Sequence, residues 1–187
     1  NMEITQALSI KGKYRLVQCD PSLAPRLYEK IVQLISKGRA EWREYRALVN
    51  AYHRQAFISA TEFENLIPTV GRSVLAQRLA GTTTYTGTIN YAALGSGTTT
   101  PINADTKLAT ETYRKTIDSQ TYANNIAYLS AFVAAGVATA THYEAGLFID
   151  GTASADSGQI FSHVLFSPPE AKTALASLTL DISVSIA

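Results

Sequence analysis

The sequence is poor in the residues from which covalent and metal-held frameworks are built. Cys19 is its only cysteine, so an intrachain disulfide and a cysteine-rich zinc site are both excluded. Charged residues make up 17% of the chain and hydrophobic residues 46%, a balance typical of globular proteins. We therefore expect stability to come from packing or from assembly.

Long hydrophobic runs are also missing. No apolar stretch approaches the roughly 20 residues that a membrane-spanning helix needs. The opening residues, from Asn1 to Ile4, lack a basic segment followed by an apolar one. We expect neither a membrane span nor a signal peptide.

The motifs of several enzyme classes are absent as well. The segment at residues 95–100 has neither the lysine nor the glycine spacing of a phosphate-binding loop, and no Gly-x-Ser-x-Gly turn of a serine hydrolase is present. A glycosidase needs two acids that converge on a groove, but four aspartates fall in or near predicted loops, where we interpret them as turn formers: Asp105, Asp118, Asp150 and Asp156. The prediction is a protein without catalytic residues or a cofactor.

The histidines leave one metal-site alternative open. His142 and Glu144 share a face of one predicted strand, and His163 could complete a set of two histidines and one carboxylate. Histidines on strands are more often surface or hydrogen-bonded residues, so we expect no metal site.

Charge is distributed unevenly along the chain. Residues 1–80 contain 12 basic and 7 acidic residues, a net charge of +5, whereas residues 81–187 contain 4 and 8, a net charge of −4. A basic region can signal nucleic-acid binding. Here most of the charges alternate in sign along a predicted helix, which is typical of a solvated face. Nucleic-acid binding is therefore not expected.

The basic region predicts a strand followed by two helices. Residues 13–19 have β-branched and aromatic content and stop at Asp20, which with the following proline is a helix-start signal. Apolar residues then recur at helical spacing as far as Gly38, which suits a C-terminal cap. A second stripe contains Trp42, Tyr45, Val49, Tyr52 and Ala56. These patterns predict a helical hairpin within residues 21–56.

Three aromatic residues of this hairpin are candidate structural or interface residues: Trp42, Tyr45 and Tyr52. In one interpretation they are buried against the apolar stripe of the first helix. In the other, the hairpin projects from the β module and contacts a neighbouring subunit, because two helices have little interior of their own. The two interpretations are compatible.

The texture of the sequence changes after residues 57–81, where we expect an irregular extended segment and a short helix. From Thr82 onward, short apolar segments alternate with turn residues, which is typical of an all-β domain. Strands are predicted at residues 86–94, 110–117, 121–133, 141–149, 160–166 and 178–186. In the last of these, five apolar residues alternate with polar ones, so one face should point into a core.

The fold class predicted from these patterns is mainly β with an α insertion. An antiparallel β-sandwich at residues 82–187 follows an N-terminal strand region at 1–20, the hairpin at 21–56 and the segment at 57–81.

Four blocks of the sequence together resemble a group of small bacteriophage virion proteins. They lie at residues 65–81, at 91–114 with the motif Ala-Leu-Gly-Ser-Gly-Thr-Thr-Thr-Pro, at 144–148 with Glu-Ala-Gly-Leu-Phe, and from 161 to the end. The resemblance covers about residues 57–187 and leaves the hairpin as an insertion. His163 stands where that group is expected to carry arginine. The resemblance implies a virion component of the tail, fibre or head-decoration type.

Six residues of these blocks are further candidate structural or interface residues: Arg72, Gly95, Gly97, Arg114, Glu144 and Gly146. The glycines at 95 and 97 are expected to take positive φ and end a strand sharply. Glu144 is expected to be a buried acceptor for backbone amides or for Arg72 or Arg114. Glu111 and Arg114, three apart in a predicted strand, should face opposite sides and have different partners.

The function expected from this sequence is that of a non-enzymatic structural protein of a phage particle. Its expected partners are other virion proteins and further copies of itself. The alternative is a receptor- or glycan-binding module of a phage appendage, using the loops at residues 95–105 and 150–158. Those loops contain almost no aromatic residues, which disfavours the alternative.

Overall fold

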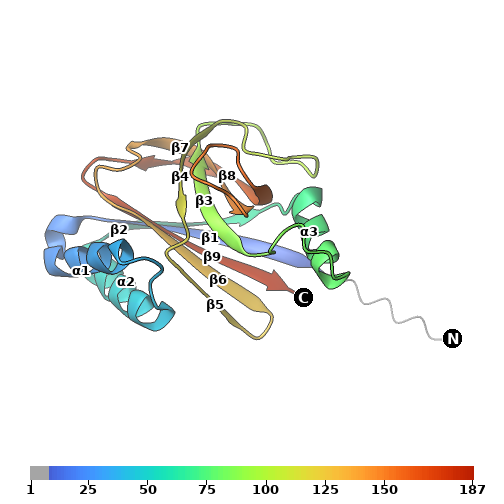
Figure 1. Cartoon of the computed structure of the whole chain (residues 1–187). Coiled ribbons are helices and arrows are strands. Elements are labelled where there is room, and N and C mark those ends of the chain that lie inside the picture. The colour runs from blue at the N-terminus through green and yellow to red at the C-terminus, as the bar shows by residue number, and fades with distance from the viewer. Residues whose placement is uncertain (1–8) are drawn as a thin grey trace.

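The computed structural model describes residues 9–187, which form two antiparallel β-sheets packed face to face, with three α-helices (Figure 1). The predicted class, an antiparallel β-sandwich with a helical insertion, is confirmed. The expectation of no signal peptide at Asn1 to Ile4 lies outside the described residues. Within residues 9–187, no helix combines the length and apolar character needed to cross a membrane.

Sheet A has the strand order β2-β1-β9-β6-β5, with every neighbouring pair antiparallel. Its strands are β1 (Ile10–Cys19), β2 (Phe57–Asn65), β5 (Ser119–Ala123), β6 (Ile126–Val133) and β9 (Ser177–Ile186). The alternating last strand therefore lies at the centre of the sheet. The sandwich also extends beyond residues 82–187, because β1 and β2 complete this sheet.

Sheet B has the order β4-β3-β7-β8 and is antiparallel throughout. Its strands are β3 (Ile89–Gly95), β4 (Glu111–Thr116), β7 (Ala140–Ile149) and β8 (Gln159–Lys172). The core lies between the two sheets, where alternate residues of β9 are buried. Leu178, Leu180, Ile182 and Val184 are each at most 5% exposed, as the period of two predicts, whereas Ile186 at the strand end is 43% exposed.

The helical hairpin consists of α1 (Pro25–Ser36) and α2 (Trp42–Ala56), and a short 3-10 helix (Pro21–Leu23) precedes it. The Asp20 carboxylate accepts the Ser22 amide and so caps this 3-10 turn. Gly38 follows α1 at φ +111°, as expected of a helix C-terminus. The third helix, α3 (Thr69–Leu79), lies at the opposite end of the sandwich (Figure 1).

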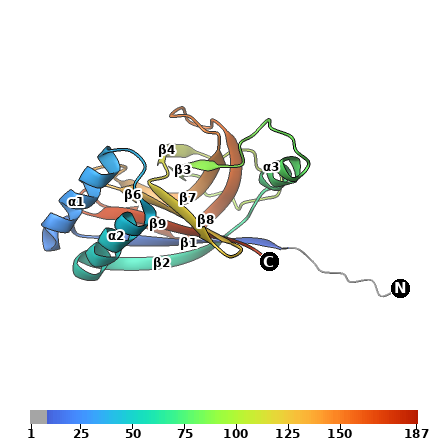
Figure 2. The same ribbon diagram turned by 60° about the horizontal axis from the view of Figure 1, so that its bottom comes forward.

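The hairpin lies along the outer face of sheet A and does not project from it (Figure 2). Its buried residues form a second apolar cluster with Val17 and Cys19 of β1 and Phe132 of β6. The interpretation in which the helices bury their aromatic residues is thus supported, although much of the surface that they bury belongs to the sheet. The projecting arrangement was wrong, because a hairpin with one apolar face is stabilised by covering a sheet face.

Two strand predictions need correction. Residues 121–133 form parts of two strands, because Asn124 and Asn125 make a two-residue turn with Asn124 at φ +52° and Ala123 paired with Ile126. Residues 57–65 form a β-strand paired with β1 along its length, with one bulge near Ile58, and are not an irregular segment. Because β2 is an edge strand with little burial, it lacks the alternating pattern that marks a half-buried strand.

Candidate functional site

The nine residues that the sequence singled out occupy separate regions of the molecule. Gly95, Gly97, Glu144 and Gly146 surround one buried cluster on the outer face of sheet B. Arg72 and Arg114 each fix a loop nearby. The three aromatic residues of α2 lie on the other side of the molecule, over sheet A.

Glu144 holds the long connection between β3 and β4 against sheet B. Its carboxylate is fully buried and accepts three backbone amides of that connection, from Gly97 at 3.0 Å, Ala109 at 3.0 Å and Thr110 at 2.7 Å. The prediction of a buried acceptor for backbone amides is confirmed. The connection at residues 96–110 is therefore fastened at both of its ends by one side chain.

His163 of β8 completes this cluster. Its Nε2 lies 2.9 Å from the Glu144 carboxylate and its Nδ1 lies 2.7 Å from the Asp105 carboxylate. Burial alone would lower the pKa of His163, but the hydrogen bonds to Glu144 and Asp105 raise it above the usual 6.5. We call these three residues the clip, because the imidazolium ties residue 105, in the middle of the connection, to the sheet.

The pKa of Glu144 moves in the opposite direction. Burial would raise it, yet the hydrogen bonds from His163 and from the amides of Thr110 and Ala109 hold it below the usual 4.5. Within the clip, Glu144 and His163 form a charged pair whose hydrogen-bond donors and acceptors are matched. Its geometry explains a structural role, because each of the two buried groups is engaged on both sides.

Neither arginine proposed as a partner of Glu144 contacts it. Arg72 donates to the carbonyl of Ile67 at 2.6 Å and to the Asn103 side chain at 3.2 Å, so it fixes another point of the same connection. The sequence did not identify His163 as the partner. The one sign in the sequence that residue 163 pairs with carboxylates was the expectation of arginine at this position. In the structure a cation is needed there, because residue 163 lies between the carboxylates of Asp105 and Glu144.

The glycines of this region are needed for close approach and not for positive φ. Neither Gly95 nor Gly97 has positive φ, which corrects the expectation. A Cβ at Gly95 would lie 2.5 Å from Oε1 of Glu144, and one at Gly97 would overlap the same carboxylate and the Ala109 methyl group. Any side chain would therefore displace the clip.

Arg114 fixes the loop between β7 and β8. It donates to Glu111 through Nε at 2.5 Å and Nη2 at 2.7 Å, and to the carbonyls of Thr152 and Ser157 at 3.0 Å each. The expectation that Glu111 and Arg114 face opposite sides was wrong. The pairing of β3 with β4 shifts by one residue between Leu94 and Gly95, and this bulge turns Glu111 to the side of Arg114.

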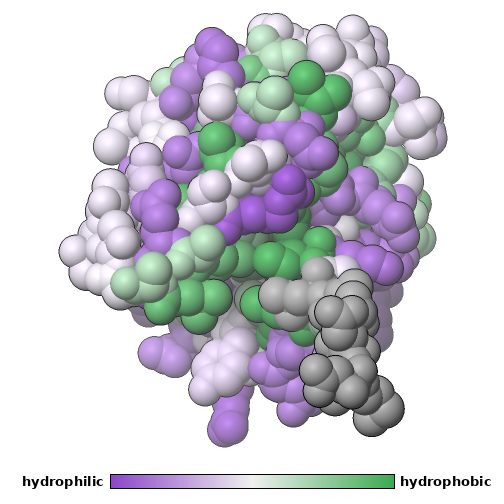
Figure 3. All heavy atoms as spheres, turned by 90° about the vertical axis from the view of Figure 1, so that its right-hand side faces the viewer, coloured by the Kyte–Doolittle hydropathy of each residue, from purple (hydrophilic) through white to green (hydrophobic). Residues whose placement is uncertain are grey.

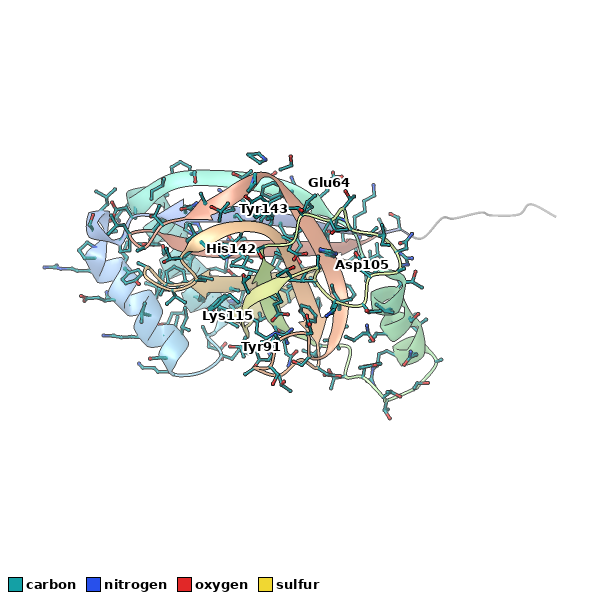
Figure 4. The ribbon with its side chains drawn as sticks, turned by 90° about the horizontal axis from the view of Figure 1, so that it is seen from above. Glu64, Tyr91, Asp105, Lys115, His142 and Tyr143 are labelled. Carbon is teal, nitrogen blue, oxygen red and sulfur yellow. The ribbon has the colours of Figure 1, made fainter. Side chains whose placement is uncertain are left out.

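The proposed metal set is not brought together. His142 lies apart from Asp105 on sheet B, as the labels in Figure 4 show, and its Nε2 contacts the carbonyl of Ala138 at 2.9 Å. The pairing of β7 with β8 is irregular between His142 and Glu144, which separates the two side chains. Burial lowers the pKa of His142 below its usual value, which favours the neutral ring.

The aromatic residues of α2 hydrogen bond to the outer face of sheet A. Tyr45 contacts the Ser130 hydroxyl at 3.1 Å, and Tyr52 contacts the Ser177 hydroxyl at 2.9 Å. His53 adds a contact to Thr179 at 3.0 Å. Tyr45 and Tyr52 are fully buried, whereas Trp42 is only partly buried. The helix thus packs on polar residues of β6 and β9.

Past the N-terminal end of α2, where Trp42 and Arg46 lie, the helix no longer covers the outer face of sheet A. A groove of about 460 Å³ lies there, and we call it the outer-face groove. Its floor comes from β1, β6 and β9, and its sides come from α2, β5 and Glu62 of β2. The prominent side chains are Lys13, Arg15, Trp42, Arg46 and Tyr128. Sequence analysis missed this site because its residues come from six separate elements.

Two further surfaces are apolar. Phe57 and Ile58, at the start of edge strand β2, are 53% and 51% exposed. At the end of the sandwich beside α3, a hollow of about 380 Å³ is lined by Leu75, Ile126, Phe161 and Val184 among others. Figure 3 views this end and shows apolar atoms framed by polar ones.

Comparison with known proteins found no matching family model, no matching curated protein and no matching solved structure.

Proposed function

We propose that this chain is a non-enzymatic structural protein of a bacteriophage particle, assembled into the virion in the host cytoplasm. It acts through contacts with further copies of itself and with other virion proteins. The order of the phage-like blocks along residues 57–187 supports the virion assignment. The observation that carries the assembly role is the free edge of β2.

Strand β2 offers a long pairing edge. Within residues 9–187 it pairs only with β1, so its other side presents backbone N–H and C=O groups without a strand partner. Residues 57–61 of this edge carry no charge, and Phe57 and Ile58 are more than half exposed. Charges, prolines or covering elements normally protect such edges from pairing with other chains. The uncharged part of this edge, residues 57–61, favours strand addition by a second chain.

The buried charged groups also support a structural role. The clip and the pair of Glu111 and Arg114 all serve to fasten loops, and their polar atoms are taken up by contacts within the chain. Groups poised for catalysis would instead be expected to converge on an accessible pocket. The proposed function therefore depends on surfaces and not on reactive side chains.

Sedimentation velocity tests this proposal with one substitution and one control. We expect the wild-type protein to sediment as an oligomer at micromolar concentration. Ile58→Lys should raise the dissociation constant by about tenfold or more, because a charge on the edge opposes strand pairing. Leu79→Lys changes a residue that is 90% exposed on α3 and should leave the oligomer unchanged.

Immunogold labelling of purified phage particles with antibody against the chain tests the virion assignment separately. A protein that stays monomeric at every concentration and never labels particles would contradict the proposal. An oligomer that Ile58→Lys leaves intact would place the interface elsewhere and remove the argument from β2.

A further inference from the structure

We infer that the outer-face groove binds an acidic saccharide. This inference goes beyond the proposed assembly role and does not depend on it, because residues 57–61 of the β2 edge do not line the groove. It also differs from the glycan-binding alternative drawn from the sequence, in which the loops at residues 95–105 and 150–158 would hold the sugar. Those loops are fastened by the clip and by Arg114.

The groove exists because α2 covers only part of sheet A. Along β9, the outward residues Ser177, Thr179 and Asp181 lie under α2 and contact it, but Ser183 lies beyond the helix. Figure 2 shows the end of the sheet that the hairpin leaves open. The volume of about 460 Å³ is within the range of about 300–1,000 Å³ typical of small-ligand sites.

Two aromatic side chains line this opening. Trp42 and Tyr128 lie side by side with ring centroids 6.2 Å apart, and neither is fully buried. Together they offer apolar ring surfaces next to polar groups, the combination that suits a ligand with both apolar faces and hydroxyl edges.

One cation of the groove, Arg15, has no ion-pair partner among the described residues. Lys13 pairs with Glu62, and Arg46 pairs with Asp181 at 2.5 Å and stacks over Trp42. Arg15 lies between Glu62 and Asp181 in the strand register, but both carboxylates already have these partners. Among the described residues, Arg15 forms no ion pair and no side-chain hydrogen bond. An exposed guanidinium in this position fits a carboxylate on the ligand.

A saccharide fits this groove better than a peptide or a nucleic acid. The floor strands β1, β6 and β9 are each paired on both sides, so they offer an extended peptide no free backbone edge. A nucleic acid would place several phosphates along the groove, which has only one described cation, Arg15, without a carboxylate partner. One carboxylate among several hydroxyl groups is matched by one spare cation beside aromatic rings and hydroxyl side chains.

The experiment begins with the full chain on an array of sialylated and uronate-containing glycans printed beside their neutral counterparts. Affinity is then measured in solution with 3′-sialyllactose and a galacturonate trisaccharide, with lactose as the neutral probe. Trp42 is the only tryptophan of the chain, so its fluorescence reports directly on the groove. We expect a saturable fluorescence change and at least about tenfold tighter binding of an acidic glycan than of its neutral counterpart.

Matched variants separate the parts of the site. Arg15→Gln should remove the preference for the acidic glycan, and Tyr128→Ala should weaken the binding of acidic and neutral glycans alike. Arg54→Gln changes an exposed arginine of α2 that does not line the groove and should leave binding unchanged. Thermal melting of each variant shows whether it is folded, and the conservative change Tyr128→Phe keeps a ring in place if Tyr128→Ala does not fold.

The same titration in the Ile58→Lys variant keeps this test apart from the assembly test, because saccharide binding should survive the loss of the oligomer. The inference is overturned if the array shows no acidic glycan bound, or if Arg15→Gln and Tyr128→Ala leave binding unchanged. It is also overturned if an acidic peptide or an oligothymidylate changes the Trp42 fluorescence and the glycans do not.

Discussion

The buried carboxylate of Glu144 explains why three residues around it are Gly95, Gly97 and His163. Glu144 needs amide donors close by, and the backbone can approach it closely only where residues 95 and 97 have no side chain. It also needs a cation, which His163 supplies. These residues are therefore linked by one requirement, the neutralisation of a buried charge.

The clip makes the stability of the protein depend on pH. Because the pKa of His163 is raised above 6.5 in the folded state, its contribution is complete below pH 6.5 and is lost as the pH rises through the folded value. The pKa of Glu144 is lowered, so its contribution is present above 4.5 and is lost only as the pH falls through the folded value. The clip is strongest between these limits.

His163→Arg should flatten this dependence on the alkaline side. A guanidinium stays charged from pH 6 to pH 9, so the free energy of unfolding should fall less over this interval than it does in the wild type. Urea unfolding at several pH values measures the difference. His53→Gln is the control above about pH 7, because the pKa of His53 is about 4 in the folded state and 6.5 in the unfolded state, so His53 is neutral in both states there. Equal slopes in the wild type and His163→Arg would mean that His163 does not carry the dependence.

At the scale of elements, α2 and β9 meet through polar contacts that match in spacing. Outward residues of β9 recur every two positions, and helix residues of one face recur every three or four. The pair Arg46 and Asp181 and the pair Tyr52 and Ser177 lie at two points along this contact. The hydroxyl and carboxylate groups of the strand thus fix where along the sheet the helix lies.

A double-mutant cycle on Tyr52 and Ser177 tests this seating. Tyr52→Phe should cost about 1 kcal/mol, and Ser177→Ala about 1–3 kcal/mol because it leaves the tyrosine hydroxyl buried without its partner. The double variant should cost less than the sum, with a coupling energy of about 1 kcal/mol from urea unfolding. Tyr52→Phe combined with Ser162→Ala, which lies in sheet B, should be additive. Additivity in both pairs would show that the Tyr52 contact contributes no coupling energy.

The whole molecule has two apolar layers that share sheet A. One lies between the sheets, and the other lies between sheet A and the hairpin. Because β1 and β9 contribute residues to both faces, loss of the hairpin would expose the outer face of the central strands. We therefore expect the hairpin and the sandwich to unfold together.

Cys19 reports on this cooperativity. It is fully buried under the hairpin, and burial raises its pKa to about 12, so the native protein should resist thiol-specific reagents at pH 8. A Cys19→Ala/Ala131→Cys variant places the single thiol between the two sheets instead. The thiol of the wild type and the thiol of this variant should become reactive at the urea concentration at which each protein unfolds. Each labelling curve is compared with the unfolding of the same variant by circular dichroism. Labelling of Cys19 well before global unfolding would show that the hairpin detaches by itself.

The sequence allowed most elements to be predicted, because their signals are local. The alternation of β9, the stripe of α2 and the glycine after α1 each depend on neighbours within one or two turns. Strand β2 and the turn at Asn124 were misjudged. An edge strand need not alternate, and two asparagines inside a long apolar pattern look like an interruption until the pairing of β5 with β6 is known.

The sequence by itself determined the fold class, the hairpin and the burial of Glu144. Only the tertiary structure decided which residues meet: His163 with Glu144, Glu111 with Arg114 across a bulge, and Trp42 with Tyr128 in the outer-face groove. The physical reason is that periodicity specifies which face a residue occupies, whereas strand order, register shifts and the reach of a covering helix specify its neighbours. Those neighbours come from distant parts of the chain.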